Sequence, residues 1–84
     1  MKDVPPFILA NGEPLKYSGI NSIGLRRRNF DLKTRNLIKK TYKLLYLSNS
    51  NISQALVKIK DEIEIIDEIK LIIDFVENSE RGLI

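Results

Sequence analysis

The residues most able to bind a ligand lie in segment 19–28, where small residues precede three consecutive arginines. The residues concerned are Gly19, Asn21, Gly24, Arg26, Arg27 and Arg28. Glycine lets a backbone approach a ligand closely, and guanidinium groups form paired charge-assisted hydrogen bonds with phosphate oxygens. A solvated basic run would explain the arginines equally well if they stood alone, and Asn21 by itself is more typical of a turn. Together with the glycines, however, they predict an anion-binding site.

The sequence contains no histidine and no cysteine. Imidazole base catalysis, thiolate chemistry and the usual zinc ligand sets are therefore excluded for this chain acting alone. Acidic residues are spread around one expected helix, which argues against an acid and base pair or a metal site: Asp67, Glu68, Asp74 and Glu77. We assign no catalytic residue, metal or cofactor, and predict that the chain holds an anion while another segment performs the reaction.

A second basic group follows the arginines on an expected helix and includes Lys39, Lys40 and Lys43. Residues 26–43 hold eight basic side chains and one acidic one, whereas residues 58–81 hold eight acidic and four basic ones. Such an uneven distribution steers anionic partners to one surface. From the residues alone, an ordinary solvated helix face is the favoured interpretation of the lysines, and a docking surface is the alternative.

With 84 residues, 43% of them hydrophobic, the chain is expected to form one small domain. Its core would be small, so we expect marginal stability or stabilisation by a partner. No signal peptide is recognisable in its first residues, and no apolar run approaches the ~20 residues of a membrane-spanning helix. The lack of cysteine fits a reducing compartment. We therefore expect a cytoplasmic protein with no membrane span.

The elements that must position these side chains change character after residue 30. Residues 1–30 hold all three prolines and three of the four glycines, which predicts an extended segment with a turn at Asn11 and Gly12. Residues 31–84 are expected to form a helical domain. Asp31, Asn51 and Asp67 stand where the N-caps of three helices would lie.

Apolar residues recur with helical spacing after each expected cap. The clearest stripe consists of Ile52, Ala55, Leu56, Ile59 and Ile63. Tyr42 and Tyr46 are expected to pack against the core with their hydroxyls at the surface. The alternation of acid and isoleucine over 62–69 is interpreted as a helix-loop-helix junction rather than a strand. Three helices with short connections predict a mainly α fold, a small antiparallel bundle.

Five motifs occur in order along nearly the whole chain: DVPPFILANG at 3–12, GIN at 19–21, GLRRRNF at 24–30, YKLLY at 42–46 and SERGLI at 79–84. Together they resemble the C-terminal part of the acyl-carrier-protein:UDP-N-acetylglucosamine O-acyltransferases of lipid A biosynthesis. None of these motifs would be specific alone, but their order and combination are.

The resemblance implies a two-part enzyme, a homotrimer in which a left-handed parallel β-helix precedes a helical C-terminal domain. Residues 3–24 would then resemble the last coil of the β-helix and the connection out of it. In the family, a histidine on the β-helix deprotonates the glucosamine 3-hydroxyl, which attacks the acyl thioester on acyl carrier protein. No residue of this chain matches that histidine, so we expect part of an enzyme with no turnover of its own.

The resemblance also implies individual roles. Asn21 matches a family asparagine near the nucleotide sugar, Arg28 an arginine associated with the UDP diphosphate, and Arg27 an arginine linked to substrate and carrier-protein binding. Ile23 departs from the pattern, because some members have a glutamate there that contacts the nucleotide ribose. The basic face would suit docking of the acidic carrier protein, and the residues assigned to it are Arg26, Lys39, Lys40 and Lys43.

Two other classes of function are compatible with the composition. A small basic helical module could bind nucleic acid through residues 26–43, with affinity that falls steeply as salt rises. The acidic C-terminal half argues against that function, because it would repel the same phosphate backbone. A scaffold or oligomerisation module without a ligand is the third possibility.

Overall fold

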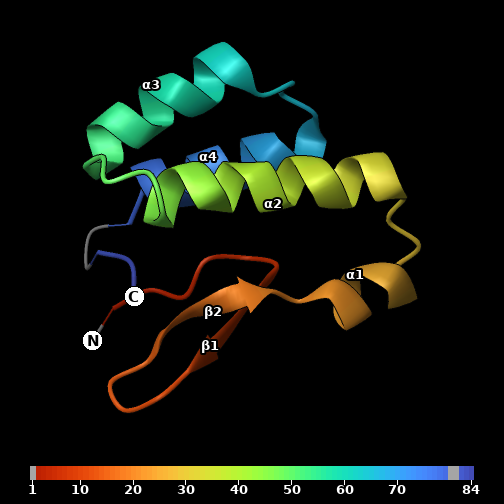
Figure 1. The fold of residues 1–84 in the computed structure, drawn as a ribbon, viewed down its shortest axis with the longest axis horizontal. Helices are drawn as coiled ribbons and strands as arrows, with labels where there is room; N and C mark the ends of the chain where they lie inside the picture. The colour runs from red at the N-terminus through yellow and green to blue at the C-terminus, as the bar shows by residue number, and fades with distance from the viewer. Residues whose placement is uncertain (1, 80–81) are drawn as a thin grey trace.

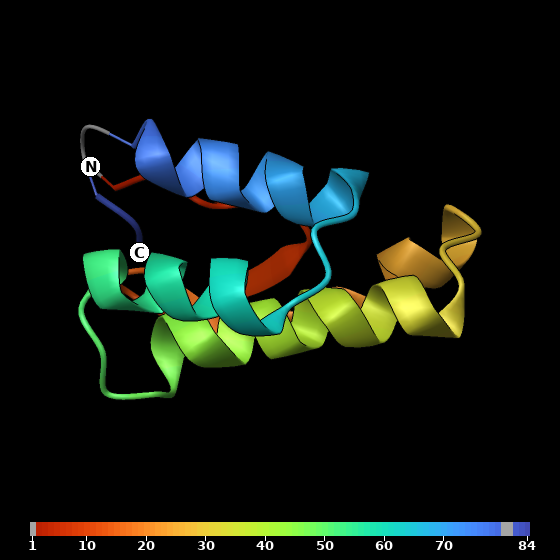
Figure 2. The same cartoon turned by 90° about the horizontal axis from the view of Figure 1, so that it is seen from above.

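The computed structural model describes residues 2–79 and 82–84, so Glu80 and Arg81 of the last motif lie outside the described residues. Its elements, in chain order, are β1 (Ile8–Asn11), β2 (Lys16–Ile20), α1 (Ser22–Arg27), α2 (Leu32–Tyr46), α3 (Ile52–Glu62) and α4 (Asp67–Glu77). The long helix α2 contacts β2, α3 and α4. Figure 1 shows the hairpin on one side of α2 and α3 on the other, while Figure 2 shows that α2, α3 and α4 alternate in direction.

The segment expected to be simply extended contains an antiparallel hairpin and a short helix. In the hairpin, Ile8 pairs with Ile20 and Asn11 with Lys16, with an irregularity between Leu9 and Ala10. The predicted turn is confirmed, because residues 12–15 connect the two strands. Gly12 has a φ of +93°, and its amide donates to Asn11 Oδ1 over 2.8 Å. Only glycine adopts such a φ readily, so this residue fixes the turn.

Two of the three predicted N-caps are confirmed. Asp31 accepts a hydrogen bond from the Thr34 amide at 2.8 Å, which lowers the pKa of the Asp31 carboxyl. Asn51 and Gln54 form a reciprocal capping box at the start of α3. The prediction for Asp67 is wrong, because Ile66 occupies the N-cap without a side-chain cap. Asp67 instead lies in the first turn of α4, where its negative charge interacts favourably with the helix dipole.

The core lies around α2 and draws residues from every helix. Its buried apolar members are Leu25, Ile38, Tyr42, Leu45, Ala55, Ile59, Ile63, Ile69, Ile72, Ile73 and Val76. Side chains of the hairpin and of the segment before it pack against this cluster, among them Phe7, Ile8 and Tyr17. The run 62–69 is the junction between α3 and α4, as the sequence predicted.

Both chain ends are fastened to each other beside this core. The Asp3 amide donates to the Gly82 carbonyl at 2.7 Å, and the Ile84 amide donates to the Asp3 carbonyl at 3.1 Å. Ser79 Oγ donates to the Asp3 carboxylate at 2.7 Å. The segment that leads into the hairpin is thereby held against the residues that follow α4 (Figure 1).

The tyrosines join the hairpin to α2, and the expectation that the hydroxyls of Tyr42 and Tyr46 lie at the surface is wrong for both. The Tyr46 hydroxyl is buried and has no hydrogen-bond partner among the described residues. Tyr42 is fully buried, and its hydroxyl donates to the Pro6 carbonyl at 2.5 Å. Tyr17 stacks on Tyr46 with ring centroids 4.4 Å apart. Burial raises the pKa of Tyr42 far above its ordinary value and raises the pKa of Tyr46 to about 12.

The stability of the fold is therefore expected to fall as the pH rises above about 10. The unfolded chain releases tyrosine protons near pH 10, whereas folded Tyr42 retains its proton, so each such group lowers the unfolding free energy by up to about 1.4 kcal/mol per pH unit. Tyr42→Phe removes one of these groups and should flatten the decline between pH 10 and 11.5. Urea unfolding of both proteins at several pH values measures the slopes, and equal slopes would contradict the burial of this hydroxyl.

Candidate functional site

The short helix α1 begins at Asn21, whose side chain caps it. Asn21 Oδ1 accepts from the Gly24 amide at 3.1 Å, and the Asn21 amide donates to the Phe7 carbonyl at 2.8 Å. A Cβ at Gly24 would lie 2.7 Å from Asn21 Nδ2. Gly24 is therefore required by the packing of the cap. Asn21, which by itself is more typical of a turn, serves here as the N-cap of α1.

The C-terminal end of α1 is also fixed by hydrogen bonds. The Phe30 amide donates to the Leu25 carbonyl at 3.1 Å, and the Asn29 amide donates to the Arg26 carbonyl at 3.0 Å. Asn29 has a φ of +60°, so these two hydrogen bonds form a Schellman motif with asparagine at the left-handed position. Leu25, four residues into the helix, is buried in the core. The hydrogen bonds at both ends of α1 and its buried Leu25 together determine the position of the arginines.

The three arginines are exposed and are brought together at the end of α1. Arg26 and Arg27 lie in its last turn, where positive charge is favoured by the helix dipole, and Arg28 is its C-cap. Among the described residues, no acceptor or carboxylate pairs with any of these side chains. Their N–H donors are thus directed to solvent or to a ligand.

Arg28 differs from the other two because it contacts two aromatic rings. Its Cζ atom lies 5.0 Å from the ring centroid of Phe30 and 5.6 Å from that of Phe7. These rings were not singled out from the sequence as part of a site. The available signal was their place in the motifs at 3–12 and 24–30, on either side of the arginines.

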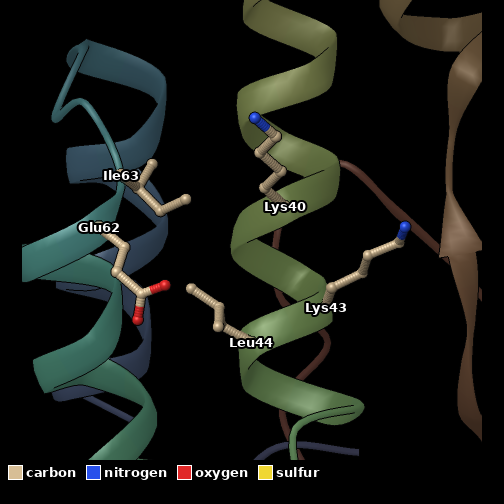
Figure 3. A pocket seen from close by; sticks show the side chains of 5 residues that line it. All are labelled: Lys40, Lys43, Leu44, Glu62 and Ile63. Carbon is tan, nitrogen blue, oxygen red and sulfur yellow. The ribbon is translucent and has the colours of Figure 1, made fainter.

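The predicted docking lysines are exposed on α2, away from the arginine cluster. Lys40 and Lys43 border a shallow groove between α2 and the end of α3, together with Leu44, Glu62 and Ile63 (Figure 3). In the part of the chain that the structure describes, Lys39, Lys40 and Lys43 form no ion pair, whereas Lys33 pairs with Glu64 and Lys60 with Glu77, each at 3.2 Å. The three free ammonium groups contribute to an open basic surface.

The described residues form neither a metal centre nor a membrane-spanning helix. Over 2–79 and 82–84, no three acidic side chains come together as ligands for a metal ion. None of the helices in these ranges has the length and apolar character needed to cross a membrane. Ile23, the departure from the expected motif, is an exposed residue of α1.

Comparisons with known proteins place this arrangement in a family. The family model for UDP N-acetylglucosamine O-acyltransferase, domain 2, matches residues 3–84. The acyl-[acyl-carrier-protein]--UDP-N-acetylglucosamine O-acyltransferase of Thermodesulfovibrio yellowstonii is 42% identical over 82 residues, which is 98% of this chain and 32% of that protein. The protein of the same name from Syntrophobacter fumaroxidans is 40% identical over 83 residues.

Solved structures agree with the sequence relatives. The structure of a UDP-N-acetylglucosamine acyltransferase from Bacteroides fragilis matches with a TM-score of 0.97 and 49% identity, over 100% of this chain and 33% of that one. The Acinetobacter baumannii structure matches with a TM-score of 0.92 and 39% identity over the same shares. The chain spans about a third of the length of these proteins. The resemblance read from the motifs is thereby confirmed: the chain belongs to the family of UDP N-acetylglucosamine O-acyltransferase domain 2.

Proposed function

We propose that this chain is the helical domain of an enzyme that transfers a 3-hydroxyacyl group from acyl carrier protein to the glucosamine 3-hydroxyl of UDP-N-acetylglucosamine, the first step of lipid A biosynthesis. The observation that carries the proposal is the cluster of exposed arginines that pair with none of the described residues, in a chain whose relatives are named for these two substrates. The chain has no histidine, so a histidine base of the kind that the family uses would come from residues outside this chain.

The arginines and the cap of α1 would bind the nucleotide sugar. We assign Arg28 to the diphosphate and Arg27 to the substrate beside it, because both residues are exposed and no described residue pairs with either guanidinium group. Asn21 has its Oδ1 engaged by Gly24, but no described residue accepts from its Nδ2. Asn21 would therefore act toward the ligand as a hydrogen-bond donor.

The open basic surface would receive the carrier protein. Arg26 lies on α1 and the exposed lysines lie on α2, so the two groups would contact different parts of the carrier protein. Exposed charges of this kind act mainly by steering an oppositely charged partner, and salt screens them. An acidic carrier protein supplies the charge that the surface lacks. The residues assigned to docking are Arg26, Lys39, Lys40 and Lys43.

The same proposal includes the position of this chain in the whole enzyme and the oligomeric state of that enzyme. We place residues 3–24 at the end of a left-handed parallel β-helix, as its last coil and the connection out of it, with the domain boundary after residue 30. The strands of the hairpin pair antiparallel with each other, so the hairpin would belong to the connection rather than to the coil. The antiparallel bundle of α2, α3 and α4 would then stand at the end of that β-helix in a cytoplasmic homotrimer. A partner surface of this kind would cover apolar side chains that are exposed here, such as Leu15 and Leu47.

The chain by itself should show no acyl transfer, because it lacks the base. A chimaera in which the chain replaces the matching third of the Bacteroides fragilis enzyme should transfer a hydroxyacyl group from its carrier-protein thioester to UDP-N-acetylglucosamine. Thioester-dependent acylation of the nucleotide sugar measures both. Turnover by the 84-residue chain above the rate without protein would contradict the proposed division of labour.

Within the chimaera, Arg28→Ala should weaken apparent binding of the nucleotide sugar by about 2–3 kcal/mol, the scale of lost charge-assisted hydrogen bonds. The corresponding rise in KM is about 30- to 150-fold. Arg28→Lys should recover only part of it, since a point charge lacks the planar fork. Steady-state kinetics with UDP-N-acetylglucosamine varied decide the matter, and wild-type kinetics for Arg28→Ala would remove this residue from the site.

The double reversal Lys39→Glu and Lys43→Glu should slow association with acyl carrier protein at low ionic strength and leave the affinity for UDP-N-acetylglucosamine nearly unchanged. The defect should shrink toward ~0.5 M salt, where screening removes most of the steering. Stopped-flow association over a salt series measures it. Reversal of the exposed Lys16 and Lys70 is the control with an equal change of net charge. Equal slowing by both pairs would reject a docking surface on α2.

A further inference from the structure

Two aromatic rings from separate segments meet beneath the arginine cluster. Phe7 precedes β1 and Phe30 follows α1, yet their ring centroids are 5.7 Å apart with an interplanar angle of 64°, an edge-to-face pair. Both side chains are partly buried and pack against the core. The Arg28 guanidinium contacts both rings, with its Cζ 5.0 Å from the Phe30 centroid and 5.6 Å from the Phe7 centroid. Contacts at these distances are favourable cation–π interactions.

The backbone holds both rings in place. Asn29, next to Phe30, takes the left-handed position of the Schellman motif, and Phe7 has a φ of +69°, which is rare for an aromatic residue. Residues with side chains seldom adopt this left-handed conformation, and such positions concentrate where a site demands an exact placement. The Phe7 carbonyl accepts from the Asn21 amide, and the Phe30 amide closes the Schellman motif on Leu25. The cap of α1 and the two rings therefore form one connected unit.

The contact of Arg28 with the two rings should favour ligand binding by restricting the arginine side chain. A free arginine side chain loses considerable rotational freedom when a ligand orders it, and that loss weakens binding. The aromatic pair restricts Arg28 in advance while the guanidinium N–H groups remain without a partner among the described residues. Arg26 and Arg27 have no such ring contact among these residues, so Arg28 is the preorganised member of the cluster.

We propose that Phe7 and Phe30 are positioning residues that hold the Arg28 guanidinium ready for the diphosphate of a nucleotide sugar. This inference rests on the proposed function, because it takes Arg28 as the diphosphate ligand. The rings themselves would not touch the substrate. Their effect would pass through Arg28 alone, and that property separates a positioning role from a general contribution to stability.

The test uses the chimaera defined above. Phe30→Leu keeps an apolar side chain but removes the ring, and should raise the KM for UDP-N-acetylglucosamine about two- to fivefold, the scale of an exposed cation–π contact. The kcat and the KM for the acyl carrier protein substrate should stay within twofold of wild type. Phe30→Tyr restores a ring and should restore the KM. Phe7→Leu provides a second variant with the same expected pattern, in case Phe30→Leu does not fold.

A double-mutant comparison and a matched control make the outcome decisive. On the Arg28→Ala background, Phe30→Leu should raise the KM no further, because the group it positions is gone. Phe75→Leu makes the same change at a partly buried ring of α4 and should leave the KM unchanged. A full additional rise on the Arg28→Ala background, or an equal rise for Phe75→Leu, would overturn the positioning role.

The two levels of the proposal fail in different ways. Suppose that Arg28→Ala raises the KM while Phe30→Leu and Phe7→Leu both leave it at the wild-type value. The positioning role of the two rings is then rejected, and the proposed contact of Arg28 with the diphosphate is retained. If Arg28→Ala itself leaves the KM unchanged, the role of Arg28 in the proposed function is rejected, and the positioning role with it.

Discussion

The hydrogen bond from the buried Tyr42 hydroxyl to the Pro6 carbonyl is the contact on which the placement of the site depends. It fastens the segment before β1 to α2, at a tyrosine that has no exposed surface. The next residue, Phe7, then receives the Asn21 amide on its carbonyl, and Asn21 caps α1 through Gly24. A continuous series of contacts thus runs from the core to the helix that carries the arginines.

This arrangement separates the parts that stabilise the domain from the parts that are available to ligands. Leu25 is the one residue of α1 that is buried, and it anchors the helix in the core. The arginines on the same helix keep their charged groups exposed. A six-residue helix has little stability of its own, so its two caps and this single anchor must supply the rigidity. The geometry of the predicted anion site therefore depends on the helical core.

The features predicted from the sequence are those set by local chemistry. Asp31 and Asn51 cap α2 and α3 because a short polar side chain can reach the free amides of the next turn, wherever the helix packs. Asp67 had the same residue type but missed the cap by one position, which local propensity does not resolve. The family could also be recognised, because its motifs extend over the whole chain.

What the sequence did not reveal depends on contacts between distant residues. The hairpin pairs Ile8 with Ile20, and α1 is too short to show helical periodicity. The left-handed backbone of Phe7 has no signature in residue type, so its approach to Phe30 and Arg28 could not be foreseen. The arginines were predicted to bind an anion from their chemistry, and that remains a prediction, whereas the contact of Arg28 with the two rings could be recognised only in the fold.

The most direct test of this account is a crystal structure of the chimaera with UDP-N-acetylglucosamine bound. The quantity to measure is the distance from the Arg28 guanidinium nitrogens to the nearest diphosphate oxygens. We predict about 2.7–3.2 Å, with the guanidinium still seated on Phe7 and Phe30. A bound nucleotide sugar whose diphosphate lies beyond hydrogen-bonding reach of both Arg27 and Arg28 would contradict the account.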